Sequence, residues 1–143
     1  MERMTKSILI NAPVEKVFAY MEDASNLPEI WPSMVEINNI KVDQKGFATY
    51  DWTYKMAGVH IKGASKTLEY VPNKRIVVTN EKGVESKFTW DYYPESNGTK
   101  LSVEAEYAIP GSVLGKLAKS FIIKQNEREA DTLLENLKVR MET

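Results

Sequence analysis

The sequence predicts an α+β fold in which a seven-stranded, curved antiparallel sheet grips one long C-terminal helix. From about residue 35 to residue 107, apolar and polar side chains alternate with a period of two, in segments separated by turn signals. This pattern is typical of antiparallel strands. From about Ser112 onward, apolar residues recur at helical spacing instead. Because a sheet with one apolar face has to cover that face, we expect the helix to pack across it.

The N-terminal region predicts one strand and two short helices. Thr5 to Asn11 alternate weakly as a strand, which Ala12-Pro13 ends, since proline lacks an N–H donor and favours a helix start. A short helix is expected from Pro13 to Met21. Its apolar face consists of Val14, Val17, Phe18 and Met21. Asp23 to Pro32 predicts a second short helix or helical turn, because two prolines prevent a long one.

Six further strands are expected to follow as a meander. The inward-facing residues of the three clearest strands are Tyr50, Trp52, Tyr54 and Met56, then Phe88, Trp90 and Tyr92, then Leu101, Val103, Ala105 and Tyr107. The intervening residues are mostly polar or charged. One face of the sheet is therefore expected to be apolar and aromatic, and the other to face water.

The strand predicted from Val59 to Val71 has mixed faces. If Lys62 and Lys66 point to water, the alternation places three small residues on the covered face beside the aromatic residues. These are Gly63, Ser65 and Thr67. Small side chains there would leave space beneath the helix. Leu68 and Tyr70 have the opposite parity, so they require a bulge or an exposed strand end.

The C-terminal helix is predicted to begin at Ser112 and to have an interrupted apolar face. The face consists of Val113, Leu114, Leu117, Ala118, Phe121 and Ile122, and resumes with Leu133, Leu134, Leu137 and Met141. Between these groups, helical spacing passes through Asn126 and Glu129, so two polar groups are expected to face the sheet. With no repeats or linkers, residues 1–143 are expected to form a single domain.

The composition excludes several kinds of function. Lys and Arg number 19 against 20 for Asp and Glu, a formal charge of −1, so no nucleic-acid partner is expected. No apolar run is long enough to span a bilayer and no signal sequence is seen, which predicts a cytoplasmic protein with no transmembrane segment. The chain has no cysteine and one histidine, His60, which parity places on the surface. We therefore expect no metal and no cofactor.

Three stretches resemble a known family. Ile8-Leu9-Ile10-Asn11-Ala12-Pro13, followed by Val14 to Phe18, resembles the START-like (SRPBCC) superfamily, which shares the helix-grip fold of the birch-pollen allergen. Asp23 to Pro32, and Trp90-Asp91-Tyr92-Tyr93-Pro94 with Gly98-Thr99, are similar to polyketide cyclase/dehydrase-type members. The resemblance covers nearly the whole chain. It implies a hydrophobic pocket between sheet and helix, but no single activity, since members include lipid carriers, cyclases, coenzyme Q binding proteins and cochaperone domains.

The candidate ligand-binding residues are those expected between the sheet and the helix. They are Tyr50, Trp52, Tyr54, Gly63, Ser65, Thr67, Val78, Phe88, Trp90, Val103, Tyr107, Ala118, Ile122, Gln125 and Asn126. The alternative is that the aromatic residues only fill a core. Catalytic candidates are Glu129, whose burial would make it an acid or base near neutral pH, and Glu69 near the pocket's mouth. The alternative is that both carboxylates are solvated or ion-paired.

Three functions follow from these observations. The first is binding or transport of a small hydrophobic ligand of lipid, isoprenoid or polyketide-like type. The second is an enzyme of the polyketide cyclase or dehydratase kind, in which the pocket orients a reactive chain. The third is a protein-interaction module with a filled core and an exposed apolar patch around Leu27, Ile30 and Trp31.

Overall fold

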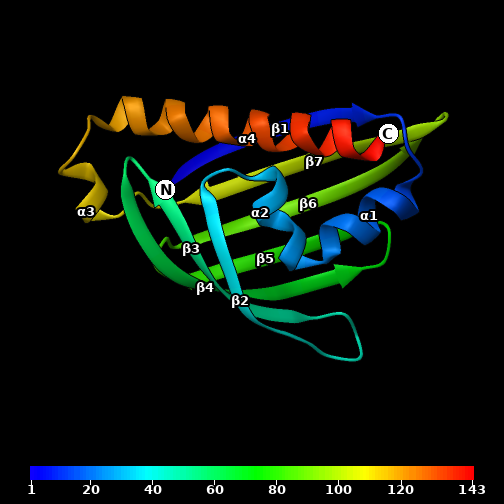
Figure 1. Ribbon diagram of the computed structural model, residues 1–143, viewed down its shortest axis with the longest axis horizontal. Helices are drawn as coiled ribbons and strands as arrows, with labels where there is room; N and C mark the ends of the chain where they lie inside the picture. Colours follow the sequence, from blue (N-terminus) through cyan, green and yellow to red (C-terminus); the bar gives the residue numbers. More distant parts are fainter.

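A computed structural model describes residues 1–143 and contains one seven-stranded antiparallel sheet (Figure 1). The strands are β1 (Glu2–Ile10), β2 (Met34–Val42), β3 (Ala48–Met56), β4 (Val59–Val71), β5 (Arg75–Lys82), β6 (Ser86–Glu95) and β7 (Gly98–Tyr107). Their order across the sheet is β1-β7-β6-β5-β4-β3-β2. The strands from β2 to β7 form a meander, and β1 pairs with β7 at the far edge. The predicted fold class is confirmed.

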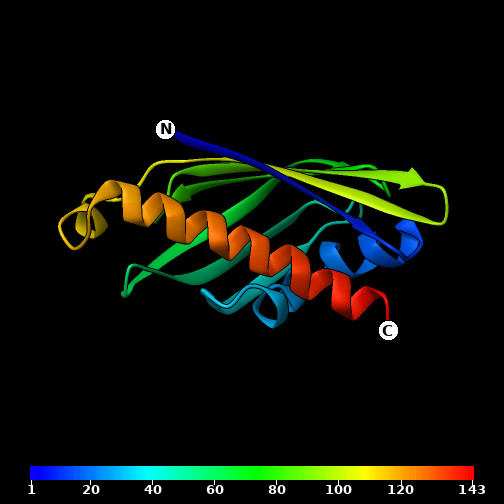
Figure 2. The same cartoon turned by 90° about the horizontal axis from the view of Figure 1, so that it is seen from above.

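The helices lie on one side of this sheet (Figure 2). They are α1 (Val14–Glu22), the 3-10 turn η1 (Ala24–Asn26), α2 (Leu27–Ile30), α3 (Gly111–Leu114) and α4 (Lys119–Met141). At one edge α4 contacts β1, at the other α2 contacts β2, and α2 and α4 touch each other. The helices therefore cover the apolar face from both edges. None of them combines the length and apolarity needed to cross a bilayer.

The predicted start of the long helix is wrong. The segment after β7 forms the short helix α3, and α4 begins only at Lys119, after Ala118 has adopted an extended conformation with φ −62° and ψ 141°. Gly115 lies in the break, and glycine in a helix interior costs about 1 kcal/mol relative to alanine. Only Val113 of this region is buried, so packing does not offset that cost. Leu114, Leu117 and Phe121 remain exposed.

The alternation predicted for the strands is confirmed, including the irregular one. In β4, Ser65 and Thr67 are buried while Lys62 and Lys66 are exposed. The pairing of β4 with β5 shifts register between Thr67 and Glu69, which is a bulge, one of the two explanations that the sequence left open. Leu68, the unpaired residue of the bulge, is exposed, and beyond it Tyr70 turns inward to pack edge-on against Phe18 of α1 at 5.6 Å between ring centroids.

Candidate ligand-binding cavity

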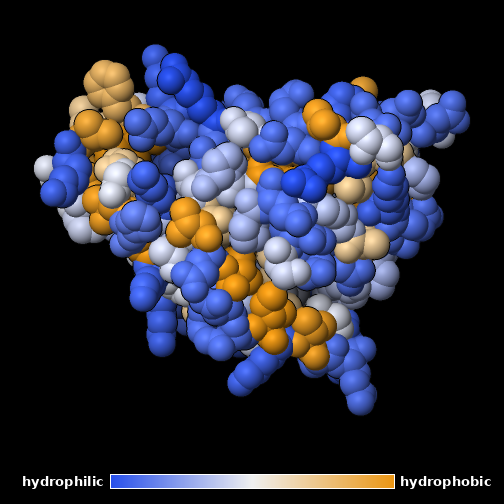
Figure 3. All heavy atoms as spheres, viewed as in Figure 1, coloured by the Kyte–Doolittle hydropathy of each residue, from blue (hydrophilic) through white to orange (hydrophobic).

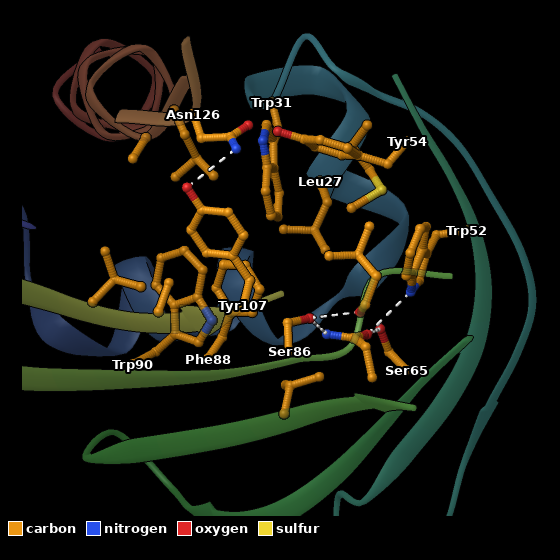
Figure 4. Close-up of a pocket in the computed structure, with 18 of the residues that line it drawn as sticks. Leu27, Trp31, Trp52, Tyr54, Ser65, Ser86, Phe88, Trp90, Tyr107 and Asn126 are labelled. Carbon is orange, nitrogen blue, oxygen red and sulfur yellow. Dashed lines mark hydrogen bonds between the residues drawn. The ribbon is translucent and has the colours of Figure 1, made fainter. Parts of the chain in front are cut away.

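A cavity of about 120 Å³ lies between the sheet, α2 and α4 (Figure 4). It is lined by 24 residues, of which 20 are hydrophobic and none is Asp, Glu, Lys, Arg or His. The four polar residues are Ser65, Asn80, Ser86 and Asn126. An apolar cavity of roughly 150 Å³ holds a benzene molecule, so the space in this conformation suits a group near the size of one ring. A larger ligand would have to displace side chains.

Aromatic side chains form much of the wall. All three tryptophans of the chain line the cavity. Trp31, which follows α2, packs edge-on against Tyr54 of β3 and Phe88 of β6, with ring centroids 5.5 and 5.7 Å away. Phe88 in turn lies nearly parallel to Trp90, with 13° between the ring planes. The wall therefore combines a flat apolar surface with rings that hold one another in place.

A buried hydrogen-bond network occupies the sheet side of the cavity. Trp52 Nε1 donates to Asn80 Oδ1 at 3.0 Å, and Ser65 Oγ bonds to the same oxygen. Asn80 Nδ2 donates to Ser86 Oγ at 2.8 Å, and Ser86 Oγ donates to the Val84 carbonyl at 3.0 Å. These polar groups satisfy one another, so they need no ligand to compensate their burial.

A second polar group lies where α4 faces the sheet. Asn126 Nδ2 donates to the Tyr107 hydroxyl at 3.2 Å. The Tyr54 hydroxyl and the Trp31 indole lie at the same end of the cavity (Figure 4). Trp31 Nε1 differs from the others because it is buried and has no hydrogen-bond partner.

The phenols of the cavity are held in the protonated form. Burial raises the pKa of Tyr50, Tyr54, Tyr92 and Tyr107. The negative charge of Glu129 adds to this effect at Tyr54, whereas the nearby Trp31 indole opposes it. No lining side chain other than these tyrosines is titratable, so the cavity is neutral at physiological pH.

Ten of the predicted ligand-binding residues line the cavity, and their role in binding stays a prediction. They are Tyr50, Trp52, Tyr54, Ser65, Val78, Phe88, Trp90, Val103, Tyr107 and Asn126. They come together because the alternation of β3 to β7 points one face of every strand at α4.

Two predicted residues of β4 do not line the cavity. The space expected over Gly63 is filled by the Trp52 indole, since a Cβ on Gly63 would lie 2.3 Å from Trp52 Cζ2. Thr67 is buried, but its Oγ1 accepts a hydrogen bond from the Ala48 N–H at 3.2 Å. Small residues here accommodate a neighbouring strand rather than a ligand.

Three predicted residues of the C-terminal region also lie elsewhere. Ala118 is exposed because the helix is broken before it, and Gln125 is exposed because adjacent helical residues point about 100° apart. Ile122 is fully buried in the core, outside the cavity lining.

Neither catalytic candidate lines the cavity. Glu129 is half-buried, and its Oε1 accepts a hydrogen bond from the Ser33 N–H at 2.6 Å. Glu69 follows the β4 bulge, and its carboxylate lies 3.9 Å from the Arg75 guanidinium in a half-exposed pair. The alternative of a solvated or ion-paired carboxylate describes Glu69, whereas Glu129 is half-buried and its partner is a backbone N–H.

Several lining residues were missed by the sequence analysis. Asn80 continues the period of two set by the inward-facing Ile76 and Val78 of β5, so the alternation along this strand could have predicted that Asn80 faces the cavity. Trp31 lies outside regular structure, where no periodicity indicates direction. It was placed instead in an exposed patch with Leu27 and Ile30, and this prediction is wrong, because both of those residues are buried.

Exposed apolar side chains gather elsewhere. Leu114, Leu117 and Phe121 are 45%, 38% and 62% exposed. They belong to the region of α3 and the start of α4, where apolar atoms lie at the left end of the molecule in Figure 3. The break between the two helices therefore exposes the apolar face that one continuous helix was expected to bury.

Comparisons with known proteins agree with this architecture. The chain matches the profile of the family described as polyketide cyclase / dehydrase and lipid transport over residues 1–142. No curated protein matches it. Similar solved structures include a protein from Thermus thermophilus, with 18% identity, 98% of this chain and 97% of that chain covered, and a TM-score of 0.84.

Two further structures show the breadth of the fold. The Zhui aromatase/cyclase from a Streptomyces species has 15% identity over 99% of this chain and 93% of that chain, with a TM-score of 0.78. A START superfamily protein from Mycobacterium smegmatis has 15% identity over 98% and 97%, with a TM-score of 0.78. At these identities the likeness shows the fold, and the family match covers almost every residue. The chain therefore belongs to the family described as polyketide cyclase / dehydrase and lipid transport, and it has the helix-grip fold of these similar structures.

Proposed function

We propose that this protein binds and carries a small hydrophobic ligand in the cavity between the sheet and α4. The observation that carries the proposal is the lining, in which 20 of 24 residues are hydrophobic and none is an ionised side chain. Such a wall favours ligands by removing their apolar surface from water, at about 25 cal/mol per Å² before ordering costs. The family description, which includes lipid transport, supports the same conclusion.

The chemistry of the lining favours a carrier over an enzyme. A cyclase or dehydratase moves protons, and a general base works best with a pKa near the operating pH. The only titratable side chains in the lining are tyrosines, whose pKa values burial moves away from neutrality. The similarity to an aromatase/cyclase keeps the enzyme as the second candidate, with Tyr54 and Tyr107 as hydrogen-bond donors that orient a substrate.

An interaction module is supported less well. That function predicted a filled interior and an exposed patch at Leu27 and Ile30, whereas the structure has a cavity and buries both residues. The lack of a nucleic-acid partner stays a prediction from the balanced charge, and a cytoplasmic location stays a prediction from the sequence.

Filling the cavity tests the proposal. Toluene, a neutral probe with one aromatic ring, is titrated into the protein and its binding is measured by calorimetry. We expect saturable binding to the wild type and at least a tenfold loss of affinity in Val103→Phe, because Val103 is buried and lines the cavity. The matched control is Val139→Phe on the outside of α4, where the residue is 63% exposed, and it should bind normally.

Equal binding by the wild type and both variants would contradict the proposal, because the probe would then bind outside the cavity. If Val103→Phe does not fold, Ala105→Val makes a smaller change in the same wall. Mass spectrometry of molecules extracted from natively purified protein separates the two candidate functions. A carrier retains and releases an unchanged ligand, whereas a cyclase converts added polyketide chains and loses turnover in Tyr54→Phe.

A further inference from the structure

We infer that Trp31 is the specificity-determining residue of the cavity, and that its indole N–H binds a carbonyl oxygen of a neutral, flat, mainly apolar ligand. This inference rests on the proposed function. It begins from an unsatisfied group, since Trp31 Nε1 is buried without a hydrogen-bond partner and lines the cavity. An indole N–H only donates, so only an acceptor can satisfy it. Leaving such a donor unpaired costs about 1–3 kcal/mol.

The Trp31 indole lies close to the Tyr54 hydroxyl and opposes the rise in its pKa, but the indole N–H does not meet hydrogen-bond geometry with that oxygen. Neighbouring contacts hold the residue in this position. The Trp31 backbone N–H donates to the Leu27 carbonyl at 2.9 Å, which ties the residue to α2. The carbonyl of Ile30 accepts a hydrogen bond from Asn136 Nδ2 of α4 at 3.0 Å. The ring itself is fixed by its edge-on contacts with Tyr54 and Phe88. The donor is therefore preorganised, which reduces the ordering cost of binding.

The groups beside the indole also favour an acceptor. The Tyr107 oxygen accepts from Asn126 Nδ2, which leaves the Tyr107 proton free to donate. The hydroxyl of Tyr54 lies at the same end of the cavity (Figure 4) and is protonated. Trp31 and these two hydroxyls place three donor protons around one region, where the side-chain acceptors beside them are Asn126 Oδ1 and the Ser33 hydroxyl near Tyr54. A ligand oxygen with two lone pairs can accept from the unpartnered indole N–H and from the Tyr107 hydroxyl.

Charge distinguishes a ketone-like oxygen from a carboxylate. The lining holds no Lys, Arg or His, so an anionic ligand would lose its hydration without gaining a counter-charge. The negative charge of Glu129, which acts on Tyr54, would repel an anion further. A neutral carbonyl avoids both costs. The rings of Phe88 and Trp90, which are stacked on each other, give the lining an aromatic character that suits a flat unsaturated body.

Three probes with one benzene ring, the size that the cavity accommodates, test the inference: acetophenone, which has a carbonyl, ethylbenzene, which has no acceptor, and benzoate, which is an anion. Binding is measured by calorimetry and by NMR of the three ¹⁵N-labelled indoles. We expect the ketone to bind about tenfold more tightly than the hydrocarbon, as one buried hydrogen bond would give, and the carboxylate to bind most weakly. The Trp31 indole proton should move downfield only with the ketone, while that of Trp52, already bonded to Asn80, should move little.

The variant Trp31→Phe keeps a ring in the wall and removes the donor. It should retain binding of ethylbenzene and lose the preference for the ketone, whereas the control Tyr93→Phe, at an exposed residue of β6 outside the cavity lining, should keep that preference. If the hydrocarbon binds the wild type and the ketone binds no better, or the carboxylate binds best, the inference is overturned while the proposed function stands. If none of the probes binds, both are overturned. If Trp31→Phe does not fold, the chemical shift of the Trp31 indole proton in the wild type still tests the inference, because a ketone that leaves this shift unchanged does not bind the indole N–H.

Discussion

Replacing Gly63 with alanine should strongly destabilise the protein, although the change adds one methyl group. Gly63 lies opposite Trp52 in the pairing of β3 with β4, and the Trp52 indole covers it. A Cβ at this position would lie 2.3 Å from Trp52 Cζ2 and 2.4 Å from the Lys82 carbonyl oxygen. Favourable contacts between carbon atoms lie at about 3.5–4.0 Å, so both neighbours would have to move by more than about 1 Å.

The expected magnitude has two parts. The Lys82 carbonyl belongs to the backbone of β5, which is paired with β4, so relief of the clash there distorts the sheet. Overpacking of this kind typically costs about 1–3 kcal/mol. If the indole moves instead, Trp52 Nε1 leaves Asn80 Oδ1, and a buried unsatisfied donor costs about 1–3 kcal/mol more. We therefore expect Gly63→Ala to lower the free energy of unfolding by about 2–6 kcal/mol.

Urea denaturation followed by tryptophan fluorescence measures this change, because all three tryptophans line the cavity. The matched control is Gly111→Ala in α3, where an added Cβ would have no atom within 4 Å. Its unfolding free energy should stay within about 0.5 kcal/mol of the wild type. If Gly63→Ala were as stable as this control, the indole would not occupy the space over Gly63, and that space would be available to a ligand after all.

Two further predictions concern a buried network and a surface carboxylate. Asn80→Ala removes the hydrogen-bond partner of Trp52, Ser65 and Ser86, and should lower the free energy of unfolding, measured in urea, by about 2–4 kcal/mol. The control Asn38→Ala, on the exposed strand β2, should change the free energy of unfolding by less than about 0.5 kcal/mol. Lys138 and the Asn11 N–H lower the pKa of Glu142 in the folded protein. The carboxylate therefore stabilises the fold fully above its unfolded pKa of about 4.3, and this stabilisation is lost as the pH falls through the lower folded pKa. Glu142→Gln should therefore be less stable than the wild type at pH 7, and the difference should vanish in acid; a difference that persists at a pH of about 2 would contradict this assignment.

Much of the fold could be predicted because its elements obey local rules. In β3, β6 and β7 the alternation of aromatic and polar residues assigned the inward face, since a strand turns successive side chains to opposite sides. The opposite parity of Tyr70 in β4 even indicated the bulge that the register contains. The helix break after Leu114 was missed, because apolar spacing continues through it and only Gly115 opposes the pattern.

The candidate site could be predicted only in part. Asn126 was found because helical spacing carried the apolar face of α4 through it. Trp31 could not be found in this way, since its direction depends on how α2 packs against α4 and not on any repeat. For Glu129, helical spacing predicted a position in the cavity that the side chain does not take. The same helical spacing pointed it inward, but a hydrogen bond from the Ser33 N–H holds its carboxylate outside the cavity lining.

The sequence by itself determined that one sheet face is apolar and aromatic, and that a C-terminal helix covers it, because periodicity is a property of neighbouring residues along one chain. The tertiary structure decided what occupies the space between them. The sequence suggested room over Gly63, yet the indole of Trp52 takes that room, and the open volume lies beside Trp31 and Asn126 instead. A cavity is the volume left after side chains from distant strands and helices have packed, so its position depends on contacts that no single segment encodes.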